Sequence, residues 1–230
     1  MKIFAILVCA HVLGDFLLQP NSMVKQKNKP WIFLLHLLIH GLLGWLFLAQ
    51  WRLWVIPLYI IATHGILDLI KRRMPDTAKT FVVDQCLHII LVYVLAVYLN
   101  RCNISIITAS VYKPLVWFSG FVATVQGSGY LVAKVAKNLI ERNKLEIDGL
   151  EGGGALIGQL ERALIFLFVI IGQPEGIGFL IAAKSILRFE KAHDGSPSEA
   201  KHAEYVLIGT LFSFTLAIAL AYLTSKAVNL

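Results

Sequence analysis

The sequence predicts an all-α, polytopic membrane protein with about seven or eight transmembrane helices. Hydrophobic residues make up 57% of its 230 residues. Charged residues make up only 15%, whereas soluble domains carry about 25%. The mean hydropathy is +0.71. The apolar residues also come in long blocks, and a membrane-spanning helix needs about 20 of them in succession.

Seven apolar blocks are long enough to cross a bilayer, and an eighth is short. In chain order the predicted spans are residues 2–19, 31–49, 53–71, 82–99, 107–134, 155–172 and 204–224, and the short block is 176–190. The polar stretch 188–203 is expected to form a loop because it is rich in Gly, Ser and Pro. We expect one membrane domain over 1–230, with a four-helix bundle at 1–99, further helices at 107–230 and a Gly-rich cytoplasmic connection at 149–158.

Basic residues alternate between the predicted loops, and this sets the orientation. The loops after the first, third and fifth spans carry clusters of Lys and Arg, whereas the loops after the second and fourth carry only Arg52 and Arg101. Cytoplasmic loops are the ones enriched in Lys and Arg. The pattern therefore predicts an N-terminus outside the cytoplasm. The net charge of +7 follows from this topology, and we expect no nucleic-acid partner.

Ionisable residues recur within the first four predicted helices at a regular spacing. Each helix carries one pair spaced i, i+4, which places both side chains on one helix face. All four pairs fall in the cytoplasmic half of the bilayer under the predicted orientation, so they can converge in one bundle. The set comprises His11, Asp15, His36, His40, His64, Asp68, Asp84 and His88.

This set favours a metal site built from facing helices of a bundle. Imidazole and carboxylate ligands suit zinc first, with manganese or iron as alternatives, and eight candidates are enough for one or two ions. Gln19 and Gln85 are expected to hydrogen-bond the ligands from outside. Two other interpretations stay open at this stage, namely a buried polar network without metal and ligation of haem.

A second set of polar residues is expected near the cytoplasmic face, and we assign it to substrate binding. Cationic side chains in this set suit an anionic head group or phosphate. The alternative is that these residues form ion pairs with neighbouring carboxylates. The set comprises Lys71, Glu161, Arg162, Lys184 and Arg188.

The ordered motifs resemble an uncharacterised bacterial membrane family, domain of unknown function family 3307. The resemblance is carried in the first half by HVLGDFLLQ at 11–19, HxxxH at 36–40, HGILDLIK at 64–71 and DQxxH at 84–88. In the second half it is carried by GALIGQLER at 154–162, AAKSILRF at 182–189 and EYVLIGT at 204–210. The resemblance implies a multi-pass protein of the bacterial inner (cytoplasmic) membrane. The HxxxD-bearing helices also look, more distantly, like membrane-bound metal-dependent hydrolases.

The sequence therefore predicts a membrane-embedded metal-dependent hydrolase that acts on a lipid or lipid-linked substrate at the cytoplasmic face. Asp15, Asp68 and Asp84 are the candidate catalytic carboxylates, as metal ligands or as the general base. Two alternatives remain open: a transporter for a divalent metal or protons, and a non-catalytic membrane module stabilised by metal. The sequence does not fix the oligomeric state.

Overall fold

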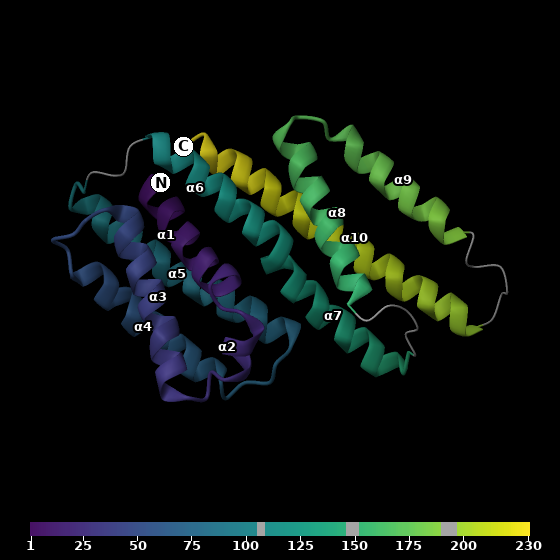
Figure 1. Cartoon of the computed structure of the whole chain (residues 1–230), viewed down its shortest axis with the longest axis horizontal. Coiled ribbons are helices and arrows are strands. Elements are labelled where there is room, and N and C mark those ends of the chain that lie inside the picture. The colour runs from purple at the N-terminus through teal and green to yellow at the C-terminus, as the bar shows by residue number, and fades with distance from the viewer. Residues whose placement is uncertain (105–108, 146–151, 190–196) are drawn as a thin grey trace. The chain divides into compact units, whose positions relative to one another are not determined.

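The chain is helical, without any strand, over the residues that the computed structural model describes: 1–104, 109–145, 152–189 and 197–230. The helices form two compact units (Figure 1). The first unit comprises Met1–Ala123 with Lys226–Leu230, and the second comprises Thr124–Ser225. That the whole chain forms one membrane domain stays a prediction.

The first unit is built around its N-terminal helix, which contacts three others. Helix α1 packs against α3, α5 and α6, while α4 packs against both α3 and α5. The elements are α1 (Lys2–Val12), a π-helical turn (Leu13–Leu17) that continues it, α2 (Asn21–Lys25), α3 (Pro30–Leu48), α4 (Val55–Lys71), α5 (Ala78–Arg101) and α6 (Ala109–Val122).

Local sequence signals fix the starts of the two helices that follow the basic loops. Pro30 occupies the first turn of α3, where the missing N–H costs nothing and the fixed φ suits a helix. Thr77 precedes α5 and forms a reciprocal capping box with Thr80. This capping box satisfies backbone N–H groups that have no partner within the helix.

The first unit has an apolar end and a polar end. Ile3, Ile6 and Leu7 lie near the start of α1 and pack with residues near the ends of α3 and α5 and the start of α4. The predicted His/Asp pairs lie at the opposite ends of these same helices. Burial of the apolar cluster therefore holds the four helices together at one end while the polar side chains meet at the other.

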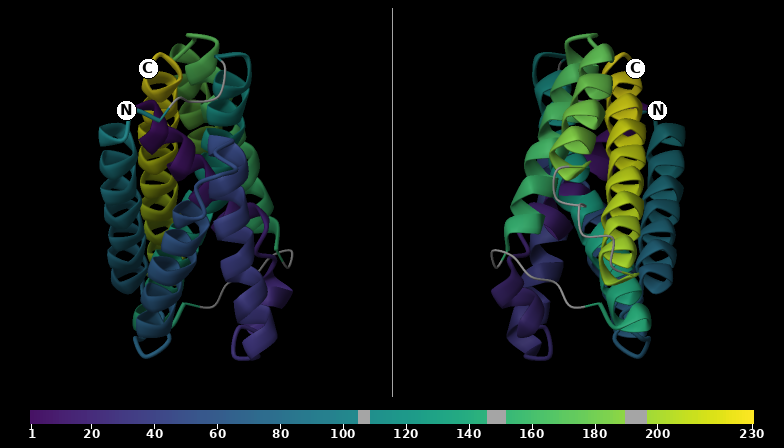
Figure 2. Two further views of the ribbon diagram at one scale, coloured as in Figure 1. Left: turned by 90° about the vertical axis from the view of Figure 1, so that its left-hand side faces the viewer. Right: turned by 90° about the vertical axis from the view of Figure 1, so that its right-hand side faces the viewer.

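The second unit contains the remaining helices, and α8, α9 and α10 lie side by side in it (Figure 2). Ile165 of α8, Ile177 of α9 and Phe214 of α10 share one buried cluster. The elements are a π-helical turn (Ala123–Gly127) that continues α6, α7 (Ser128–Asn143), α8 (Gly153–Ile170), α9 (Glu175–Phe189) and α10 (Pro197–Val228).

Five helices in the described residues are long and apolar enough to cross a membrane. They are Pro30–Leu48, Ala78–Arg101, Ser110–Asn143, Gly153–Ile170 and Lys201–Val228. Helix α4 has 17 residues and α9 has 15. At about 1.5 Å per residue, α4 reaches about 26 Å, against about 30 Å for the hydrocarbon core. The chain thus has the character of a membrane protein, while the count of seven or eight spans and the outside N-terminus stay predictions.

Two expected loops are partly helical. The predicted loop 188–203 is wrong over 197–203, because α10 already begins at Pro197, and proline is well suited to a first helical turn. The Gly-rich connection 149–158 is helical from Gly153 onward. Gly152 supplies the positive φ of 74° just before that helix, a conformation that glycine adopts without steric cost. Residues 149–151 and 190–196 of these two segments lie outside the described residues.

Candidate metal centre

The structure brings the four predicted His/Asp pairs together inside the first unit. Helix α1 and its π-helical turn supply the first pair, and α3, α4 and α5 supply one pair each. All five imidazoles are buried, as are two of the three carboxylates, whereas Asp15 is half-buried. Such a concentration of buried ionisable groups is costly unless they bind one another or a ligand.

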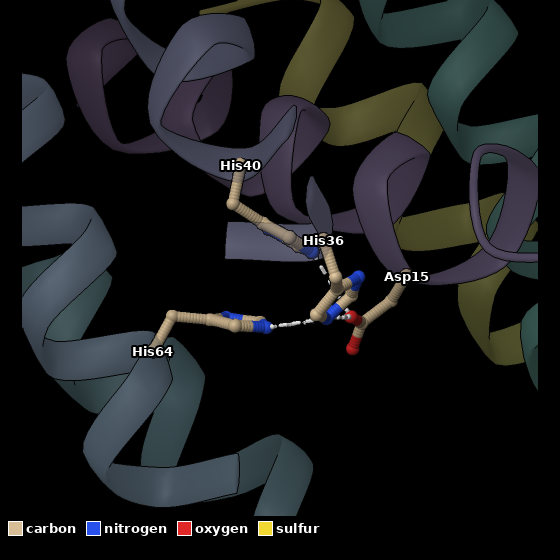
Figure 3. A group of neighbouring side chains, drawn as sticks. All are labelled: Asp15, His36, His40 and His64. Carbon is tan, nitrogen blue, oxygen red and sulfur yellow. Dashed lines mark hydrogen bonds and ion pairs between the residues drawn. The ribbon is translucent and has the colours of Figure 1, made fainter. Parts of the chain in front are cut away.

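Asp15 lies at the centre of the first group of possible ligands (Figure 3). Its Oδ1 is 3.1 Å from Nε2 of His40, 3.6 Å from Nε2 of His36 and 3.7 Å from Nε2 of His64. The Nε2 atoms of His36 and His64 are 3.0 Å apart. These four residues offer one ligand atom each within 4.8 Å of one another. Three imidazoles and a carboxylate form a ligand set that zinc accepts.

The position of Asp15 depends on the local backbone of α1. Asp15 lies in the π-helical turn Leu13–Leu17, and such turns are frequent at functional sites because the wider turn redirects a side chain. Gly14 beside it lets His40 approach closely, since a Cβ at this position would lie 2.6 Å from His40 Nε2. The π-helical turn and the glycine together permit the contact between Asp15 and His40.

His64, Asp68 and His88 form a second group, also with ligand atoms within 4.8 Å. His64 belongs to both groups. Oδ2 of Asp68 lies 3.5 Å from Nε2 of His36, which links the groups a second time. Two of the eight predicted ligands, His11 and Asp84, belong to neither group.

The two glutamines expected near the ligands do contact them. The Gln19 amide lies 3.1 Å from Nδ1 of His36. Gln85 donates from Nε2 to Oδ2 of Asp15 at 3.0 Å, and its Oε1 accepts from Nε2 of His11 at 3.2 Å. Contacts of this kind hold metal ligands in orientation. His11 therefore reaches Asp15 through Gln85 and also directly, since its Nε2 lies 3.7 Å from Oδ2 of Asp15.

Two lysines neutralise the carboxylates at the polar end of the unit. Lys27 donates to Oδ2 of Asp68 at 2.7 Å, and Lys71 donates to Oδ2 of Asp84 at 2.5 Å. The pairing of Lys71 with a carboxylate was one of its two expected roles. Lys27 was missed as a site residue, because it lies 41 positions before Asp68 and in sequence is only one of several loop lysines. Arg72, which donates to the backbone carbonyl of Lys27 at 2.7 Å, holds this loop against α4.

A small cavity of about 30 Å³ adjoins both groups. Four imidazoles line it, those of His11, His40, His64 and His88, together with apolar residues such as Leu7. This volume is enough for one water molecule, which needs about 10–15 Å³ on the same measure. The rest of the lining is largely apolar, as at Leu91 and Leu95, so the cavity offers a single water-sized ligand a place beside imidazole rings.

Residues 3–116 match a family described as protein of unknown function (DUF3307). This part of the chain belongs to that family. The matched range contains the whole His/Asp set and both lysines. No curated protein and no solved structure matches the chain. The motifs at 154–162, 182–189 and 204–210 lie outside the matched range, so their link to DUF3307 stays a prediction.

The remaining predicted substrate residues lie in the second unit, outside the range matched by DUF3307. Lys184 pairs with both oxygens of Glu161, at 2.7 Å and 2.8 Å. Arg162 is buried and donates from Nε to the carbonyl of Val125 at 3.0 Å, next to the π-helical turn Ala123–Gly127. The side chain of Arg188 lies outside the described residues.

Proposed function

We propose that the first unit is a membrane-embedded, metal-dependent hydrolase. Its first ion would be held by Asp15, His36, His40 and His64. The observation that carries the proposal is the convergence of three buried Nε2 atoms on one carboxylate oxygen, at 3.1 to 3.7 Å. Zinc is the best fit to three imidazoles and one carboxylate, and manganese or iron are alternatives.

A bound divalent ion would supply an activated water and polarise a carbonyl or phosphoryl oxygen. The chain's own residues would hold the ion and transfer the proton. Asp84 is buried, lies in neither ligand group and contacts His88, with its Oδ1 3.6 Å from Nδ1. We therefore propose it as the general base, which the Lys71 ammonium holds in its ionised form. Asp15 and Asp68 serve as ligands in this proposal, with Gln85 fixing the orientation of Asp15.

The substrate class follows from the charge at the polar end. Lys27 and Lys71 lie there, with side-chain exposures of 20% and 34%, while the carboxylates they bind are nearly covered. Partly exposed ammonium groups above a metal site favour a substrate with an anionic head group. In a membrane protein this suits an amphiphilic, lipid or lipid-linked substrate. The substrate-binding role expected for Lys184, Glu161, Arg162 and Arg188 of the second unit stays a prediction.

The distribution of positive charge also supports a position of the site on the cytoplasmic side of the membrane. Lys27, Lys71 and Arg72 gather at the same end of the unit as the His/Asp groups. Basic residues flank spans on the cytoplasmic side, so the site is proposed to face the cytoplasm, in the inner membrane of a bacterium. The opposite end of the unit is filled by an apolar cluster that includes Ile6, Ile56 and Leu99. That cluster favours a one-sided site over a path for ions.

The test measures first the metal bound to the protein and then its hydrolytic activity. The full-length chain in detergent is analysed by mass spectrometry beside His40→Ala, His64→Ala and a matched control, His202→Ala in the second unit. We expect bound zinc, manganese or iron in the unchanged chain and the control, and less bound metal in the other two variants. The metal-loaded chain is then tested in mixed micelles on long-chain nitrophenyl esters and phosphates. Absence of metal after reconstitution, or hydrolysis that persists in both variants, would contradict the proposal.

A further inference from the structure

A ring nitrogen of His88 is one of the buried side-chain atoms of the first unit that have no hydrogen-bond partner among the described residues. The other nitrogen, Nδ1, lies 2.9 Å from the backbone carbonyl of Asp84 and must donate to it, because a carbonyl only accepts. In the neutral ring Nε2 then carries the lone pair. Nε2 has no hydrogen-bond partner among the described residues, and the residue is 3% exposed. A buried acceptor without a partner is costly. A ligand bound to this nitrogen would remove that cost.

The tautomer of His88 is the one that metal-binding histidines use. A histidine that donates one ring N–H to a backbone carbonyl presents the other nitrogen to the metal in a fixed orientation. Two further ligands lie beside it, since His64, Asp68 and His88 offer ligand atoms within 4.8 Å of one another. They come from two adjacent helices, α4 and α5. The two helices thus hold the three ligand residues of the second group in place before an ion binds.

We infer that the first unit holds two divalent metal ions next to each other, the second of them bound by His64, Asp68 and His88. This inference rests on the proposed function and deepens it. A neutral imidazole offers one lone pair, so His64 serves one ion at a time. Its assignment to the second ion leaves Asp15, His36 and His40 for the first. Each ion then has three protein ligands, the number that leaves a position open for water in catalytic zinc sites.

The space around these ligands suits a shared water. The cavity of about 30 Å³ is lined by His40 from the first group, by His88 from the second and by His64, which belongs to both. A water held there would lie beside imidazoles that both ions would use, and the rest of the lining is largely apolar, as at Leu91 and Leu95. Two-metal sites stabilise the attacking and the leaving oxygen together in displacements at phosphorus. With Lys27 and Lys71 beside the carboxylates, a phosphate ester is the substrate class that this centre would take.

Lys27 binds Asp68, one of the three ligands proposed for the second ion. It donates to Asp68 at 2.7 Å and is partly exposed, whereas His88 on the opposite side of the group is buried. An ion at this position would share Asp68 with Lys27. Asp68→Asn keeps an acceptor for Lys27 while weakening the metal ligand, which makes it a gentler variant than removal of the side chain.

The test is the number of ions bound. The full-length chain in detergent is titrated with Co²⁺ and followed by absorbance, and the Mn²⁺-loaded chain is measured by electron paramagnetic resonance. We expect two equivalents and an exchange-coupled Mn²⁺ spectrum in the unchanged chain. His88→Ala and Asp68→Asn should each bind one equivalent and give an uncoupled spectrum. His202→Ala should match the unchanged chain. Circular dichroism and gel filtration of each variant ensure that only folded protein is compared.

The outcomes separate the two proposals. One equivalent in the unchanged chain, unaffected by His88→Ala and Asp68→Asn, overturns the second site and leaves the proposed function standing. No bound metal in the unchanged chain overturns both. Two equivalents that both persist in His88→Ala and Asp68→Asn also overturn the second site as assigned here, since the second ion would then lie elsewhere.

Discussion

Gln85 connects three of the polar residues at the proposed centre, and its replacement by leucine tests the centre without removing a ligand. Its Nε2 donates to Asp15 at 3.0 Å and to Asp84 at 3.3 Å, and its Oε1 accepts from His11 at 3.2 Å. Leucine is similar in volume but makes none of these hydrogen bonds. Asp15 would keep its place in the π-helical turn and lose the donor to its Oδ2.

The size of the effect follows from the role of such contacts. Loss of a residue that orients a metal ligand weakens metal binding by about 10- to 100-fold, which corresponds to about 1.4 to 2.8 kcal/mol. We expect Gln85→Leu near the upper end of this range. The reason is that a single side chain supports Asp15, which is central to the first group, and also holds Asp84 and His11.

The measurement is competition for Zn²⁺ between the detergent-purified chain and a chromophoric chelator. Cys86→Ala is the matched control, because Cys86 is the next residue of α5 and is exposed. We expect weaker binding in Gln85→Leu and unchanged binding in Cys86→Ala. Equal affinities in Gln85→Leu and the unchanged chain would refute the view that Asp15 is a ligand oriented by Gln85.

Four further perturbations have defined outcomes. Gly14→Ala places a methyl group 2.6 Å from Nε2 of His40 and should displace that ring. Metal content should then fall while helical content stays unchanged. Full retention of metal would contradict the close contact between Gly14 and His40. Arg162→Met removes the donor to the Val125 carbonyl, a loss that costs about 1–3 kcal/mol for a buried group; thermal unfolding should shift down while metal binding stays unchanged, and a drop in both would argue against separate roles for the two units. Chelation should lower the unfolding temperature of the unchanged chain more than that of His40→Ala, because metal at about 100 times its dissociation constant stabilises the folded state by about 2.7 kcal/mol. Acidification should have the same effect as chelation, because protons compete with metal for imidazole.

The sequence pattern was sufficient to select the residues that meet in the first unit. Pairs spaced i, i+4 must share a helix face, and costly ionisable residues within apolar helices must face one another rather than lipid. The two glutamines could be selected for a similar reason, because Gln19 lies four residues after Asp15 and Gln85 is adjacent to Asp84. The ion pair between Lys27 and Asp68 could not be predicted, because it joins a loop to a helix across 41 positions.

What the sequence alone determined is the helical, apolar character of the chain, the match of residues 3–116 to DUF3307 and the identity of the converging side chains. These depend on composition and on helical periodicity, which are local. Only the tertiary structure decided which of the eight side chains belong to each ligand group. It placed His64 in both ligand groups, left His11 and Asp84 outside them, and left Nε2 of His88 without a hydrogen-bond partner among the described residues. Those distinctions depend on how four helices pack and on one π-helical turn at Asp15, because differences of a few ångströms between helices decide which atoms can share an ion.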